Sequence, residues 1–230
     1  MAFRVHRIST GTVVGLIVAI AVTDIVANAL TAEPARVPVK VGILCCFIVW
    51  ARRFAGLTWT ELGLGRAEVG AGLRLGGWMA LVIAAAIMLL VVFPATRSFF
   101  EDNAVAADSV THRVLMPLVI IPVGTALFEE IIFRGVLLGV LLRVATARTA
   151  IVASSVLFGL WHLPPALHDA SGDGALKAIG IVVGTIAVTT GAGLLFAHLR
   201  LRSGSLAAPV LAHAATNSFA YIGALVSLRH

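Results

Sequence analysis

The segment Thr125-Ala-Leu-Phe-Glu-Glu-Ile-Ile-Phe-Arg-Gly135 places three ionisable side chains inside an otherwise apolar stretch of the chain. Glu129 and Glu130 are adjacent, and Arg134 follows Glu130 by four residues. A charge at the centre of a membrane-spanning helix costs between ~2.5 and ~17 kcal/mol, depending on how that cost is measured. Membrane anchoring gives no reason to keep three such groups together. We therefore expect the rest of the chain to bury this segment and to bring other polar residues to it.

The composition indicates an integral membrane protein. Sixty per cent of the 230 residues are hydrophobic and 12% are charged, whereas a soluble domain carries about 25% charged residues. The mean hydropathy is +1.03. We predict an all-α fold, a polytopic transmembrane helix bundle that forms a single domain over residues 1–230. The net charge of +6 does not indicate a nucleic-acid partner, because the basic residues are spread through short loops, as is usual for membrane proteins.

Apolar segments that could cross a bilayer, which takes about 20 residues, recur along the chain. Seven spans are predicted: Gly11–Leu30, Val37–Phe54, Leu75–Phe93, Val114–Leu142, Ala150–His162, Leu176–Leu199 and Leu206–Leu228. The fourth is too long for a straight crossing and contains Pro117 and Pro122, so we predict one tilted or kinked helix. The fifth is short and is predicted to end at Pro164. The connection Gly56–Leu73 has an amphipathic pattern and is predicted to lie in the membrane interface.

The distribution of basic residues predicts the orientation of the bundle. With the amino terminus inside the cell, ten arginine residues fall in inner segments and six arginine or lysine residues in outer ones, which is a positive-inside bias. We therefore predict a cytoplasmic amino terminus and a location in the plasma membrane. Cys45 and Cys46 are adjacent, so they point about 100° apart on a helix and indicate neither a disulfide nor a metal motif.

Two later spans carry polar residues at the depth of the acidic pair. His162 ends the fifth span, and His213 lies four residues before Asn217, on the same helical face. At 1.5 Å per residue, Glu129, His162 and Asn217 lie about 18–21 Å from the predicted inner ends of their helices, and His213 lies about 12 Å from that end. These side chains are therefore predicted to share one polar layer within the membrane.

The two adjacent acids are predicted to have different roles. Glu130 and Arg134 have the spacing and order of a favourable ion pair on a helix, so we assign Glu130 to Arg134. Glu129 points about 100° away and is left to face a cavity. There it could act as a general base on water.

The other polar residues are predicted to complete this site. His162 would orient the water, and His213 and Asn217 would donate hydrogen bonds to the developing oxyanion. A structural interpretation stays open for each of them. A histidine before Pro-Pro often caps a helix, and an intramembrane asparagine often bridges two helices.

Three motifs in the second half of the chain occur in a fixed order. They are Glu-Glu-Ile-Ile-Phe-Arg-Gly from position 129, Phe158-x-x-x-His162 and His213-x-x-x-Asn217. Together they resemble the CAAX-protease and bacteriocin-processing family of intramembrane proteases, also named CPBP or Abi, with matching spacing over residues 114–217. The resemblance implies that this region is the catalytic core and that the first glutamate is the water-activating base. It also implies that both histidines and the asparagine complete the site, supported by the second glutamate and the arginine.

The resemblance also carries an expected function. The family's eukaryotic branch has eight spans, where seven are counted here, and removes the last three residues of prenylated CAAX proteins. Some bacterial members are linked to bacteriocin maturation or immunity. We therefore predict an intramembrane endopeptidase whose partners are the lipid bilayer and a peptide or protein substrate, membrane-associated or lipidated.

Two questions stay open from the sequence. The site could use Glu129 alone to activate water, or a divalent metal such as zinc held by Glu129, His162 and His213. The alternative function is a membrane transporter, or a catalytically silent binding or immunity protein, that uses the same polar layer.

Overall fold

The computed structural model describes residues 8–26, 33–100, 105, 108–172 and 174–228, which form helices and turns and contain no strand. This confirms the predicted all-α bundle. The first elements are α1 (Thr10–Asp24), α2 (Glu33–Arg53), α3 (Val69–Val92), α4 (Pro94–Arg97) and η2 (Ser98–Phe100). A long helix then consists of α6 (Val110–Leu115), η3 (Met116–Leu127), α7 (Phe128–Glu130), η4 (Ile131–Leu137) and α8 (Leu138–Val144). The last elements are α9 (Ala147–Trp161), α10 (Leu163–Asp169), α11 (Ala175–Ser203) and α12 (Ala207–Ser227).

Five helices in the described part of the chain are long and apolar enough to cross a membrane. They are Val69–Val92, Val110–Val144, Ala147–Asp169, Ala175–Ser203 and Ala207–Ser227. α1 is apolar but shorter, and residues 27–30 of the first predicted span lie outside the described residues. α2 covers the second predicted span and carries Arg36 and Lys40 near its start. A polytopic helical bundle is therefore the architecture of this chain.

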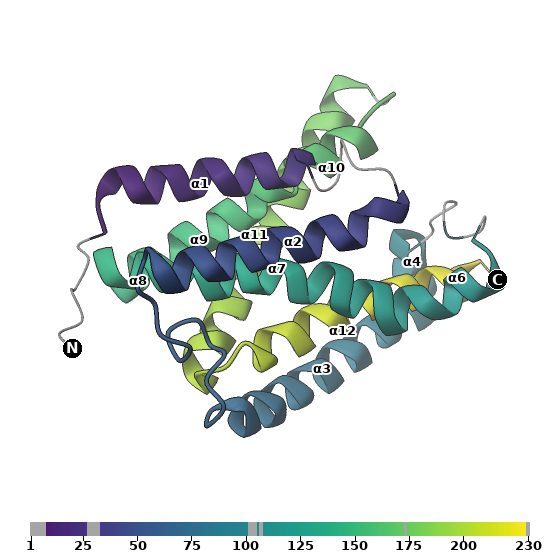
Figure 1. The fold of residues 1–230 in the computed structure, drawn as a ribbon. Coiled ribbons are helices and arrows are strands. Elements are labelled where there is room, and N and C mark those ends of the chain that lie inside the picture. The colour runs from purple at the N-terminus through teal and green to yellow at the C-terminus, as the bar shows by residue number, and fades with distance from the viewer. Residues whose placement is uncertain (1–7, 27–32, 101–104, 106–107, 173, 229–230) are drawn as a thin grey trace, which may run out of the picture.

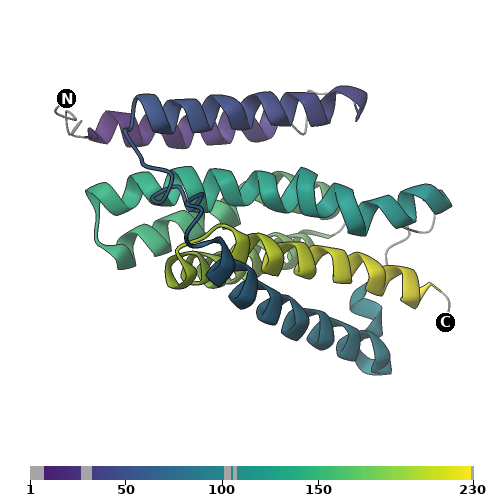
Figure 2. The same cartoon turned by 60° about the horizontal axis from the view of Figure 1, so that its bottom comes forward.

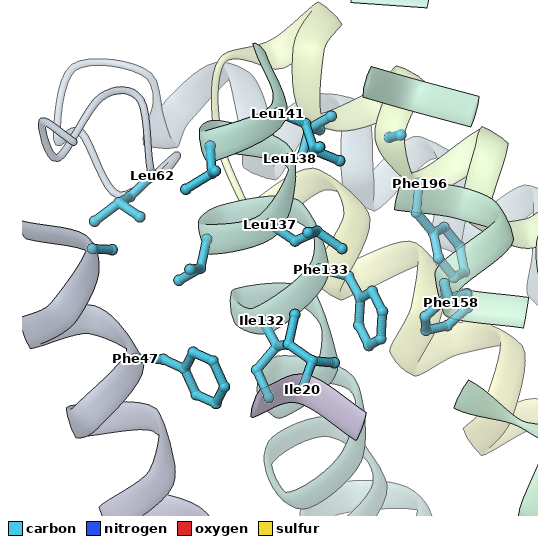
Figure 3. Close-up of a cluster of buried hydrophobic side chains, with 14 of the residues drawn as sticks. Ile20, Phe47, Leu62, Ile132, Phe133, Leu137, Leu138, Leu141, Phe158 and Phe196 are labelled. Atoms are coloured by element: carbon cyan, nitrogen blue, oxygen red, sulfur yellow. The ribbon is translucent and has the colours of Figure 1, made fainter. Parts of the chain in front are cut away.

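The long helix Val110–Val144 lies in the middle of the bundle (Figure 1). Figure 2 shows α1 and α2 as one layer on one side of this helix, with α12 and α3 on the opposite side. Apolar side chains from α1, α2, α9 and α11 meet the central helix around η4. Figure 3 shows Ile20, Phe47, Phe158 and Phe196 among them. The acidic pair therefore lies on a helix that other helices cover on opposite sides (Figure 2).

The predicted single long helix is present, and neighbouring side chains stabilise its irregular turns. Its η3 and η4 segments have the wider π-helical turn, in which a carbonyl bonds the N–H five residues later. Pro122 has no N–H, which leaves the carbonyl of Pro117 without that donor. Ser218 Oγ from α12 donates to this carbonyl at 2.7 Å.

Two further carbonyls of the long helix also accept bonds from side chains of neighbouring helices. Lys40 Nζ of α2 donates to the carbonyl of Gly124 at 3.1 Å, and Ser154 Oγ of α9 donates to that of Phe133 at 3.1 Å. Three helices are thus hydrogen-bonded to the backbone on either side of Glu129 and Glu130. Such bonds matter because an unsatisfied backbone carbonyl is costly inside a membrane.

The connection between α2 and α3, predicted to lie in the membrane interface, buries two of its leucines in the protein. Leu57 and Leu62 are buried, at 0% and 1% exposure, and pack against the central helix. A Cβ atom added to Gly139 would lie 3.1 Å from Leu57 Cδ1, and one added to Gly135 would lie 3.3 Å from the carbonyl oxygen of Leu62. The two glycines therefore allow the connection to approach the helix, so its leucines join the protein core instead of contacting lipid.

Two arginines attach this connection to the end of the bundle. Arg143 at the end of α8 donates to both carboxylate oxygens of Glu61 at 2.8 Å and to the carbonyls of Ala55 and Gly56. Arg200 of α11 donates to the carbonyls of Thr60 and Glu61 at 3.0 and 2.9 Å. Burial raises the pKa of the Glu61 carboxyl, but hydrogen bonds from Thr58 and Arg143 lower it by more. The pKa of Glu61 therefore lies below its ordinary value.

The two prolines after the fifth predicted span do not end the helical path. α9 ends at Trp161, and α10 begins at Leu163 with proline in its first turn. Proline is well tolerated there because the first N–H groups of a helix have no intrahelical acceptor. His162 thus occupies the junction between two helical segments. The prediction of a short span ending at Pro164 was wrong for this reason.

Candidate functional site

The acidic pair is buried at the centre of the bundle. Glu130 and Arg134 have no exposed surface, and Glu129 is 8% exposed. All three lie on consecutive turns of the long helix, in α7 and η4. Burying a charge away from water costs free energy unless the charge has a partner of opposite charge or a hydrogen bond. The contacts of these three side chains therefore indicate their roles.

One oxygen of Glu130 joins the central helix to α12. Arg134 Nη1 donates to Glu130 Oε1 at 2.8 Å, which is the ion pair predicted from their spacing. His213 Nδ1 lies 2.9 Å from the same oxygen. A carboxylate oxygen only accepts, so Nδ1 carries the hydrogen in this contact. The sequence assigned Glu130 to Arg134 alone, and its bond to His213 was not predicted.

The other nitrogen of His213 faces the remaining polar residues. Nε2 lies 3.2 Å from Asn217 Nδ2 and 3.8 Å from Glu129 Oε2. With Nδ1 protonated and the ring neutral, Nε2 accepts the Asn217 amide hydrogen, so both contacts fit a single tautomer. His213 therefore links Glu130, Asn217 and Glu129 in one cluster.

Aromatic rings surround the buried guanidinium. The Arg134 Cζ atom lies 4.1 Å from the ring centroid of Phe158, 5.3 Å from that of Phe196 and 5.9 Å from that of Phe133. Its Nε and Nη2 atoms have no hydrogen-bond partner among the described residues. Cation–π attraction from the three rings offsets part of that loss, and the guanidinium is held beside Glu130.

His162 lies next to this cluster and is separated from it by an aromatic ring. Its Nδ1 lies 2.8 Å from the carbonyl oxygen of Phe158, and its ring packs edge-to-face on Phe158 at 4.8 Å between centroids. Phe158 also contacts His213, at 5.8 Å. The structure thus brings Glu129, His213 and Asn217 into contact and places His162 beside them, and Nδ1 is the one nitrogen of His162 with a hydrogen-bond partner in the described part of the chain.

Two carboxylate oxygens of the cluster lack a hydrogen-bond donor. Glu129 Oε2 and Glu130 Oε2 are buried and have no hydrogen-bond partner among the residues that the structure describes. A buried acceptor without a donor is destabilising. An O–H or N–H group from a water molecule or a substrate would relieve this cost, so both atoms fit a site that binds such a group.

The residues do not form a metal site as they are placed. Within the described ranges, no three His, Cys, Asp or Glu side chains lie together as a metal-binding group. His213 uses Nδ1 for Glu130 and Nε2 for Asn217, so neither nitrogen is free to bind an ion. The zinc set Glu129, His162 and His213 considered from the sequence is therefore not assembled here.

The comparison with protein families agrees with this cluster. Residues 111–219 match the family described as type II CAAX prenyl endopeptidase, Rce1-like. The segment that carries the site belongs to this family. The CAAX endopeptidase match extends from α6 to α12 and includes all six polar residues of the candidate site. No curated protein and no solved structure matches the chain.

The shared oxygen of Glu130 predicts a large loss of stability for the Glu130→Gln variant of this protein. The variant leaves Arg134 without its counter-charge, and breaking a buried ion pair costs about 3–5 kcal/mol. We expect lower yield and a lower melting temperature in detergent. Glu130→Gln combined with Arg134→Gln should recover part of the stability, since both charges are then absent.

Glu61→Gln provides a matched control. It breaks a half-exposed pair with Arg143, which should cost about 1 kcal/mol or less. A Glu130→Gln protein that melts like the wild type would show that the buried pair is unimportant for the fold. A double variant less stable than Glu130→Gln would show that Arg134 stabilises the fold through its aromatic contacts, even without Glu130.

Proposed function

We propose that this CAAX-protease-like endopeptidase hydrolyses a peptide bond with a water molecule that Glu129 activates. The observation that carries the proposal is the unpartnered, buried Glu129 Oε2, 3.8 Å from His213 Nε2. Glu130 is occupied by Arg134 and His213, so Glu129 is the acid better placed to take a proton from water. Water activation by a positioned carboxylate is general-base catalysis.

The charge of the cluster supports Glu129 as the base. Two carboxylates and one guanidinium give a formal charge of −1 when His213 is neutral. Transfer of a proton from water to Glu129 makes the protein part of the cluster neutral. The hydroxide that attacks the peptide carbonyl is then formed near Asn217, which shares the contact to His213 Nε2 with Glu129. In a water-poor site, such charge compensation is worth more than at a protein surface.

The remaining residues have roles in the same step. Asn217 has a second amide hydrogen besides the one given to His213 Nε2, and this hydrogen is available to the developing oxyanion. His162 bonds Phe158 through Nδ1, which leaves Nε2 to orient the water. Glu130 and Arg134 support the site by fixing the position of His213.

The substrate class follows from the family and the membrane. A protease family implies a peptide or protein substrate, and membrane-spanning helices imply access from the lipid bilayer. We propose that the substrate is a membrane-associated or lipidated polypeptide. Such a substrate is already held at the bilayer, next to the helices that bury the site.

The Glu129→Gln variant tests the proposed base directly. The amide keeps the shape of the side chain but removes the proton acceptor, so turnover should fall about 10²–10⁴-fold. The fold should survive, because a neutral amide is cheaper to bury than a carboxylate. Turnover of a peptide library by protein in liposomes, with melting temperature measured in parallel, provides the test. Full turnover in the variant, or unfolding, would disprove the role.

The same preparation separates the alternative function. A transporter using this polar layer would show substrate-dependent proton flux across the liposome membrane, without peptide cleavage, because intramembrane acids and histidines also form proton relays.

Metal dependence is a separate test. Since the described residues do not assemble three ligands, we expect the activity to survive exhaustive chelation and the purified protein to contain no stoichiometric metal. Loss of activity on chelation, with recovery on addition of zinc, would instead support a metal mechanism.

We also propose that the end of the bundle carrying Arg143 and Arg200 faces the cytoplasm, as the positive-inside bias predicts. In a background with Cys45 and Cys46 replaced by serine, Arg148→Cys and Arg202→Cys should react with a membrane-impermeant maleimide only after cells are permeabilised. Asp169→Cys, at the exposed end of α10, should react in intact cells. The reverse pattern would invert the proposed orientation.

A further inference from the structure

α11 supplies none of the predicted catalytic side chains, yet one of its residues contacts the centre of the site. The ring of Phe196 stacks on the imidazole of His213, with 5.0 Å between centroids and 18° between planes. The same ring lies 5.3 Å from Arg134 Cζ. Phe196 is 2% exposed and lies beside Phe158 (Figure 3). It therefore touches both residues that bond Glu130 Oε1.

A glycine on the same face of α11 allows this contact. Gly193 lies three residues before Phe196, so both face the same neighbours. A Cβ atom at Gly193 would lie 3.1 Å from Ser155 Cα and 3.2 Å from Arg134 Nη2. Such distances are tighter than ordinary contacts. The absence of a side chain at this position thus lets α11 approach the buried arginine closely, and that approach places Phe196 against His213.

The two hydrogen bonds of His213 leave one motion of its ring unrestrained. Nδ1 donates to Glu130 Oε1 and Nε2 accepts from Asn217 Nδ2, and the hydrogen bonds of imidazole nitrogens are directed along the plane of the ring. They fix the direction of both nitrogens but resist tilting of the ring about the line between them only weakly. The torsion that turns a histidine ring is also broad. A second ring packed flat on the imidazole provides the missing restraint.

We propose that Phe196 is a positioning residue of this site, which fixes the plane of the His213 ring. This inference rests on the proposed peptidase function. By fixing the plane of the ring, Phe196 keeps Nε2 directed at Asn217 and Glu129. The oxyanion donor Asn217 and the proton acceptor Glu129 therefore keep their relative positions. Its effect on the reaction is exerted through His213, without contact to the substrate.

The experiment compares variants at two buried phenylalanines. Phe196→Leu removes the stacked ring, and Phe196→Met fills the same space with a flexible side chain. Phe196→Tyr keeps the aromatic face. Phe47→Leu on α2 is the matched control, because Phe47 is also buried in the core and has no aromatic contact with the site. Melting temperature, kcat and KM are measured for each variant in liposomes.

A second measurement does not depend on catalysis. Diethyl pyrocarbonate modifies accessible imidazole nitrogens, and mass spectrometry reports the rate at each of the seven histidines. In the wild type, His213 is 3% exposed with both nitrogens bonded and should react slowly. Release of the ring should raise its rate several-fold relative to the other histidines.

We expect Phe196→Leu and Phe196→Met to lower kcat about tenfold to a hundredfold, as for other losses of alignment, with little change in KM. Modification of His213 should be faster in both variants. Phe196→Tyr should restore most of the rate, and Phe47→Leu should change stability alone. The proposal is wrong if the two Phe196 variants match Phe47→Leu in kcat and in His213 modification. A wild-type protein that cleaves no peptide would reject the peptidase function, whereas the modification rates would still test the positioning role.

Discussion

The bond of one carboxylate oxygen to two cationic or hydrogen-bonding partners is the constraint on which this structure depends. Glu130 Oε1 accepts from Arg134 on its own helix and from His213 on α12. Both residues are buried, so the energy of this three-centre arrangement depends strongly on geometry. It sets the rotation of the central helix relative to α12. Glu129, the neighbouring residue, is thereby directed to the side where Asn217 lies.

Aromatic side chains and one glycine surround this arrangement. Two nitrogens of the Arg134 guanidinium have no hydrogen-bond partner among the described residues. The rings of Phe133, Phe158 and Phe196 cover this group. Gly193 allows α11 to reach it. Aromatic faces suit a buried cation, because they attract it and yet bring no polar atoms that would need partners of their own. The site thus combines a charged centre with an apolar shell, as a bilayer environment requires.

Local spacing in the sequence was sufficient for some features of the site. The Glu130–Arg134 pair follows from a separation of four residues, and so does the common face of His213 and Asn217. The bond between Glu130 and His213 depends on how α12 sits against the central helix, at a sequence separation of 83 residues. No local pattern encodes that distance. Phe196 likewise resembles every other apolar residue of α11 in the sequence, although its role depends on a single stacking contact.

Two features that the sequence pattern left undetermined have physical causes of the same kind. The α2–α3 connection has leucines that would suit a membrane interface equally well, and only the glycines at positions 135 and 139 indicate a surface that could receive them. Pro164 is equally compatible with ending one helix or starting the next. In both cases the local pattern permitted two structures, and packing against the central helix decided between them.

The three side chains bonded to carbonyls of the central helix restrict how this protein can move. Ser218, Lys40 and Ser154 hold the helix at Pro117, Gly124 and Phe133, above and below the acidic pair. Rotation of the helix about its own axis would break all three bonds within the membrane, where water cannot replace them. The acids therefore behave as a stationary element, and the proposed polypeptide substrate would have to enter through displacement of the surrounding helices. α1, whose buried residues Leu16 and Ile20 meet the core through apolar contacts, would lose no hydrogen bond to the central helix among the described residues on such a displacement.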